Sequence, residues 1–289
     1  MVNSRRPSWP ALLFVLPGLL SSPASAHSLT GFAPASRSAF PSTQGMFEAF
    51  PDPLSTLALA GDDLRDSLNA LSPADALKIG LRDASVAARL AAVSAAAFPR
   101  DVAAVPSLAG VMLRLDQPSR LRVAAALALG RIGDRVAVPA LVEALKDPLP
   151  DVRFAAALSL GRLPADGVVT RLERTLRSDP AWGPRYAAAI ALGRARKAFG
   201  AGALAEALAS DPAWQVRQQA ARSLADLGTA HAAQALTSAL NDPEPSVRAA
   251  AGAGLAEIGA PEQRRAAARA RREEKDPSVR AVLAVSERP

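Results

Sequence analysis

Apolar positions along most of this chain recur at the spacing of an α-helix, and the helical pattern itself repeats. In the segment that opens at Asp147, one stripe of a predicted helix carries the small or apolar residues Val152, Ala156, Ala157, Leu160 and Leu163. A glycine or proline within 161–164 ends this helix. A second predicted helix follows, and it carries two leucines four residues apart.

The same segment occurs five times at intervals of 31 or 32 residues, opening at Asp116, Asp147, Asp179, Asp211 and Asp242. The second helices of successive units carry the pairs Leu141/Leu145, Leu172/Leu176, Leu204/Leu208 and Leu236/Leu240. One helix pair cannot hide its own apolar face, so such units must stack on one another. We therefore predict an all-α fold, a right-handed α-solenoid of stacked antiparallel helix pairs.

The repeated residues resemble a known family. The pattern Asp-Pro-x-x-x-Val-Arg-x-Ala-Ala-x-x-Leu-Gly, followed by Ala-Val-Pro-x-Leu-x-x-Ala-Leu, is similar to the HEAT repeat in its short bacterial form, also called the phycobilisome-lyase-like HEAT repeat. Residues 130–134 and 138–141 match it closely. The resemblance covers 83–289 and, more weakly, 54–81. It implies that the second helices line a concave face, which usually binds a partner, and it implies no reaction.

The chain is expected to divide into three parts. We predict a signal peptide over 1–26, a flexible leader over 27–53 that is rich in Ser, Pro and Phe, and a solenoid over 54–289. Within the solenoid, the predicted units lie near 54–82, 83–115, 116–146, 147–178, 179–210, 211–241 and 242–275, with a closing half-unit over 276–289.

The first 26 residues have the order of an export signal. Arg5 and Arg6 precede an apolar run over 9–20, and Ala24-Ser25-Ala26 fits the cleavage pattern. An uncleaved anchor or a chance apolar leader is the alternative interpretation. Cleavage would remove two arginines and lower the formal net charge from +7 to +5. The sequence thus predicts a periplasmic or secreted protein with no transmembrane segment in the mature chain.

The composition argues against several kinds of chemistry. The chain has no cysteine and two histidines, which excludes disulfides, cysteine-ligated zinc and a cysteine nucleophile. HEAT-like hydroxylases of the deoxyhypusine type need several His-Glu pairs to hold iron, and this sequence has none. It also has no nucleophile motif and no phosphate-binding loop. We predict no catalytic residue, no metal and no cofactor.

An arginine follows each opening aspartate after six residues. This row could bind phosphate groups, but pairs of aspartate and arginine that link adjacent units and satisfy the turns are the favoured interpretation. The predicted structural ladder comprises Asp116, Arg122, Asp147, Arg153, Asp179, Arg185, Asp211, Arg217, Asp242 and Arg248.

Two further sets are candidate partner-binding residues. Arg131, Arg162 and Arg194 each follow the glycine that ends a first helix, where a cation is also favoured by the helix dipole. Trp182 and Trp214 hold the same place in adjacent units, with Tyr186 one turn after Trp182. These aromatic residues could stack on a ligand or pack within the protein.

These observations favour an exported, non-catalytic scaffold or adaptor that binds a macromolecule, most simply a protein, on the concave face. No small-molecule substrate is evident. One alternative is an enzyme or enzyme subunit similar to the bilin lyases that share this repeat type. The other is nucleic-acid or polyanion binding, which a basic chain permits and export makes less suitable.

Overall fold

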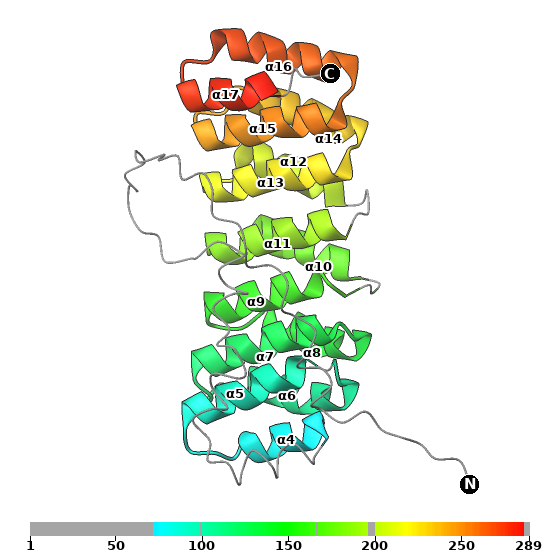
Figure 1. The fold of residues 1–289 in the computed structure, drawn as a ribbon, viewed down its shortest axis with the longest axis vertical. Helices are drawn as coiled ribbons and strands as arrows, with labels where there is room; N and C mark the ends of the chain where they lie inside the picture. The colour runs from blue at the N-terminus through cyan, green and yellow to red at the C-terminus, as the bar shows by residue number, and fades with distance from the viewer. Residues whose placement is uncertain (1–71, 99, 164, 166, 196–199, 286–289) are drawn as a thin grey trace, which may run out of the picture.

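The protein is an α-solenoid built from two layers of helices. The computed structural model describes residues 72–285 except 99, 164, 166 and 196–199, and within these residues it contains helices and turns but no strand. Helix pairs stack one above the next along the long axis, from α4 to α16, as Figure 1 shows. The predicted signal peptide (1–26), the leader (27–53) and the start of the first unit lie outside the described residues.

The first helices of the units form one layer. They are α5 (Val86–Ala97), α7 (Ser119–Ile132), α9 (Pro150–Leu160), α11 (Trp182–Arg194), α13 (Trp214–Leu227) and α15 (Pro245–Ile258). Small residues let neighbours in this layer approach closely. A Cβ added to Gly161 would lie 2.6 Å from the Cα of Ala191, and one added to Gly130 would lie 2.5 Å from the Cβ of Ser159. Side chains larger than hydrogen have no room at these crossings.

The second helices form the other layer. They are α4 (Pro73–Gly80), α6 (Val105–Leu113), α8 (Val138–Ala144), α10 (Val168–Ser178), α12 (Ala201–Ser210), α14 (Ala230–Ala239) and α16 (Pro261–Glu273). Short 3₁₀ turns precede two of them, at Val102–Ala104 and Arg135–Ala137. A single helix, α17 (Pro277–Val285), packs against α15 and α16 at the C-terminal end.

One continuous apolar core runs between the two layers, from Ala74 to Leu283. The first leucine of every predicted pair is fully buried, at Leu141, Leu172, Leu204 and Leu236. Burying each such side chain stabilises the fold by about 1.5–3 kcal/mol. Alanine is the commonest buried residue of the first helices α7 and α11, and it is also the strongest helix former.

Local sequence fixes where the helices begin and end. The hydroxyl of Ser72 caps α4 by accepting a hydrogen bond from the backbone N–H of Asp75. Gly133, Gly228 and Gly259 end three first helices at positive φ values of 78°, 61° and 70°, which glycine adopts without steric cost. Buried serines add links between first helices, since Ser159 Oγ donates to the carbonyl of Ala126 at 2.8 Å.

The last full unit is packed less densely. The first leucine of each second helix lies 25 residues after the opening aspartate, as from Asp116 to Leu141, and the same offset from Asp242 falls on Ala267. The last unit therefore keeps the register of the repeat but has alanine where the earlier units have leucine, so it buries less apolar surface there. Ala267 is the only fully buried residue of the described helix α16.

Candidate functional site

A row of arginine–carboxylate pairs joins the starts of successive first helices. Each guanidinium makes two hydrogen bonds to the carboxylate that opens the following unit. The bonds measure 2.7–2.9 Å in the pairs Arg153–Asp179, Arg185–Asp211, Arg217–Asp242 and Arg248–Glu274. Arg122 and Asp147 form an equivalent, fully buried pair. These five pairs, from Arg122 to Glu274, are the ladder.

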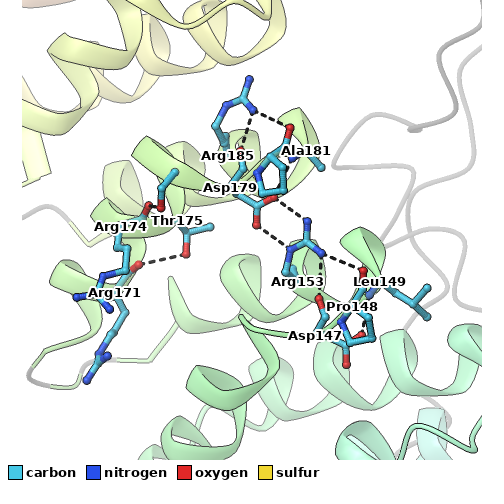
Figure 2. A network of polar contacts seen from close by, with 12 residues as sticks. Asp147, Pro148, Leu149, Arg153, Arg171, Arg174, Thr175, Asp179, Ala181 and Arg185 are labelled. Atoms are coloured by element: carbon cyan, nitrogen blue, oxygen red, sulfur yellow. Dashed lines mark hydrogen bonds and ion pairs between the residues drawn. The ribbon is translucent and has the colours of Figure 1, made fainter.

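Four of the five ladder arginines also bond to the turn of their own unit, whereas Arg122 donates instead to the carbonyl of Met112. Arg185 Nη1 donates to the backbone carbonyl of Asp179, six residues earlier, at 2.9 Å. The carboxylate of Asp179 in turn accepts the backbone N–H of Ala181 at 2.9 Å. Figure 2 shows this arrangement, with Arg153 between Asp179 and the turn at 147–149. Arg185 therefore bonds to the backbone carbonyl of the aspartate six residues earlier, while its carboxylate partner, Asp211, comes from the next unit.

Asp116 is a correction to the predicted ladder. It pairs with Arg114 at 2.6 Å on the surface, and Arg89 donates instead to the side-chain oxygen of Gln117 at 3.3 Å. The next four turns open on Asp-Pro, at Asp147, Asp179, Asp211 and Asp242, whereas this one opens on Asp-Gln. The glutamine amide supplies the acceptor and leaves Asp116 to the solvent.

The hydrogen bonds shift the protonation equilibria of the ladder. The bond to Asp179 raises the pKa of Arg153, and the bond to Asp211 raises that of Arg185 in the same way. The pKa of Glu274 lies below its usual value, chiefly because of the hydrogen bond from Arg248. These guanidinium groups therefore stay charged, and their donors are used within the chain.

The aromatic residues lie at the ladder edge, where the first helices begin. Trp182 and Tyr186 form an edge-to-face pair, with ring centroids 6.2 Å apart and planes at 83°. Both are half-buried against the core, and burial raises the pKa of Tyr186. Trp214 is 39% exposed, and among the described residues it joins no ring contact. The structure thus brings together two of the three predicted aromatic residues.

The predicted arginine column lies at the opposite ends of the first helices. The guanidinium of Arg131 lies 5.0 Å from the ring centroid of Phe98, a cation–π contact. The pKa of Arg162 is lowered first by burial and then by Arg194, Arg131 and Arg100. The three predicted residues therefore lie within electrostatic reach of one another. Arg100, which follows the end of α5, is a member that the repeat pattern did not indicate.

Two clefts open between successive second helices. One has a volume of about 360 Å³ and lies between α8 and α10; the other, of about 260 Å³, lies between α10 and α12. Their linings differ in charge. The first contains four cationic and two acidic side chains, whereas the second contains two cationic and three acidic side chains. The repeat pattern did not point to these positions because they vary from unit to unit.

Two further tests of the described residues bear on chemistry and membrane insertion. Within them, no three His, Cys, Asp or Glu side chains come together in a group able to hold a metal ion. None of the described helices combines the length and the apolar character needed to cross a membrane.

A family model for HEAT repeats matches residues 111–193 and 202–286, which is more than half of the chain. The chain belongs to the HEAT-repeat family. The match covers the units from the end of α6 to α17, which includes all five ladder pairs. A search of curated proteins found no match to this HEAT-repeat protein.

One solved structure shares the fold of this chain, and two others are similar to it in sequence. The YibA protein of Escherichia coli is similar with a TM-score of 0.53 and 15% identity, over 88% of this chain and 99% of that one. The complex of CpcE and CpcF of phycocyanin lyase from Nostoc sp. PCC7120 is 26% identical over 75% and 86% of the chains, with a TM-score of 0.48. Human deoxyhypusine hydroxylase is 24% identical over 84% and 93%, with a TM-score of 0.38.

Proposed function

We propose that this HEAT-repeat protein is an exported, non-catalytic scaffold that binds a protein partner on the face formed by its second helices. The observation that carries the proposal is the difference between its two layers. In the first layer, the arginines and carboxylates of the ladder bind each other, and the helices pack closely against one another. The second layer instead presents clefts and side chains that differ from one unit to the next.

The second-helix face has the features of a binding surface. It extends along the whole stack, and its clefts between α8, α10 and α12 are lined by charged side chains around a half-buried apolar floor that includes Val142 and Leu145. Stacked repeats generally use such extended faces to bind other macromolecules. By the resemblance to short HEAT repeats, we expect this face to be the concave side.

The proposal of export rests on the sequence of residues 1–26 alone. Arg5, Arg6, the apolar run over 9–20 and the Ala24-Ser25-Ala26 motif together form a tripartite signal. N-terminal sequencing of the protein recovered from cells tests this part directly. We expect His27 as the first residue, and recovery of an intact Met1 terminus from the cytoplasm would contradict export.

Site-specific photo-crosslinking tests the binding face. A photoreactive residue replaces Ala209, which is exposed on α12, and in a second protein it replaces Arg222, which is exposed on the first helix α13. We expect one protein partner to be captured in the envelope from position 209 and not from position 222. Equal capture from both positions, or capture of nucleic acid, would contradict the proposal.

Two further measurements test whether the tryptophans bind the partner and whether the protein resembles a bilin lyase in activity. A Trp182→Ala/Trp214→Ala variant is expected to retain the crosslink, because both residues lie at the ladder edge and not on the second-helix face. Addition of a bilin to the purified protein is expected to leave its absorbance spectrum unchanged. A spectral shift with turnover would instead support the lyase-like alternative.

A further inference from the structure

The cleft between α8 and α10 differs from the cleft between α10 and α12 in the charges at one pair of equivalent repeat positions. In the neighbouring cleft, Arg177 of α10 reaches across to Glu206 of α12, with Nε 2.8 Å from the carboxylate oxygen. Arg177 follows the second leucine of its helix, and Glu206 lies two residues after the first leucine of the next helix. These two register positions therefore face each other across a second-helix crossing.

Between α8 and α10 the same two register positions both carry positive charge, and both side chains line the cleft. Lys146 follows Leu145, the residue that caps the C-terminus of α8, and Arg174 lies two residues after the first leucine of α10. A pair across this crossing is thus repulsive. Lys146 Nζ donates instead to the carboxylate of Glu143 in the last turn of α8, at 2.7 Å. The crossing lacks the acidic group that its neighbour has.

Arg171 adds a second cation on the same cleft, one turn before Arg174. Both arginines are exposed, and neither has an ion pair with any described residue. Figure 2 shows them projecting from α10 on the side away from the ladder, where Arg153 and Asp179 are engaged with each other. The ladder groups at the inner end of the cleft are mutually neutralised, so the excess positive charge resides on Arg171 and Arg174.

The geometry points to an acidic polypeptide segment of the protein partner as the occupant of this cleft, with its carboxylates on Arg171 and Arg174. This inference rests on the proposed function, because it specifies the chemistry of the partner that binds the second-helix face. Guanidinium groups suit carboxylates because they donate two parallel hydrogen bonds. The half-buried side chains of Val142 and Leu145 in the same cleft suit an apolar residue next to the acids.

A peptide-binding measurement on the full chain tests the inference. The probe is a fluorescein-labelled peptide of repeated Glu-Leu-Glu-Gly, and its matched control replaces each glutamate by glutamine. Fluorescence anisotropy at low ionic strength should show saturable binding of the acidic peptide and none of the glutamine peptide. Binding should weaken as salt is added, because exposed charges are screened.

Two charge-reversal variants locate the site. Arg171→Glu/Arg174→Glu should weaken peptide binding by about tenfold or more, since two favourable ion pairs become repulsive. The control Arg264→Glu/Arg265→Glu makes the same change in net charge on exposed residues of α16 and should alter the affinity by less than about twofold. Circular dichroism verifies that both variants remain helical.

Several outcomes would overturn the inference. These are absence of binding to the wild-type protein, equal loss in the two variants, equal binding of an oligonucleotide of the same charge, or competition by inorganic phosphate at constant ionic strength. The proposed function fails by a different result, namely no protein crosslink from position 209. A retained crosslink in the Arg171→Glu/Arg174→Glu variant would leave the scaffold role standing and place the partner outside this cleft.

Discussion

Arginine–carboxylate pairs occur in both helical layers of this solenoid, but they are buried in the first layer and exposed in the second. In the first layer, Arg185 lies in a pair whose side chains are 11% and 5% exposed, and a similar pair recurs in successive units. In the second layer, Arg177 and Glu206 form a pair of similar length, 2.8 Å against 2.7 Å, whose side chains are 46% and 57% exposed. The comparison teaches that the repeated positions hold the stack together, while the varied positions give each crossing its own surface.

Removing one member of a buried ladder pair should have the largest effect. Arg185→Ala leaves the carboxylate of Asp211 buried without its cation and the carbonyl of Asp179 without its donor. We expect a loss of about 3–5 kcal/mol in the free energy of unfolding, measured by urea denaturation. The matched change Arg177→Ala in the second layer should cost no more than about 1 kcal/mol. Similar losses in the two variants would remove the distinction between the layers.

A glycine-to-alanine substitution should change the stability in opposite directions in the two layers. Gly161→Ala places a Cβ 2.6 Å from the backbone of Ala191, so the first helices must move apart, at a cost of about 1–3 kcal/mol. Gly202→Ala in α12 meets no atom within 4 Å and should stabilise the protein by about 0.5–1 kcal/mol. Thermal unfolding of the two variants measures both changes, and a stabilised Gly161→Ala protein would contradict the close first-layer packing.

Acid should weaken the last ladder pair. Because the pKa of Glu274 is depressed in the folded protein, the stability that its charge supplies is present above its ordinary pKa of 4.5. This contribution is lost as the pH falls through the lower, folded-state value. Glu274→Gln should therefore destabilise the protein at neutral pH, and the difference from wild type should shrink toward pH 3. Urea denaturation at several pH values measures it, and a constant difference would contradict a role for the charged carboxylate.

The smallest effect on folding is expected from the cleft arginines. Arg171→Glu/Arg174→Glu should change the free energy of unfolding by no more than about 0.5 kcal/mol, since both side chains are exposed and lack ion pairs within the described structure. Chemical denaturation measures this change. A large loss of stability would show that these arginines belong with the structural residues of the first layer.

Much of the architecture follows from local patterns. The period of the opening aspartates predicted the helix pairs, and the leucines at 141, 172, 204 and 236 are buried as that pattern requires. The resemblance to HEAT repeats is confirmed by the family match. Asp116 was assigned wrongly, because the pattern recorded an aspartate at the right spacing but could not show that Gln117 takes over its role.

The chain itself determined the secondary structure, the repeat and its register, because helical periodicity, proline and glycine positions and alanine content act over a few neighbouring residues. Only the tertiary structure decided which carboxylate each arginine meets and which cations share a crossing. Arg153 pairs with Asp179, 26 residues away, and Lys146 and Arg174 line the same cleft although they come from different units. Such contacts depend on the distance and rotation between stacked helices, which are set by the packing of alanine, glycine and leucine across the whole core.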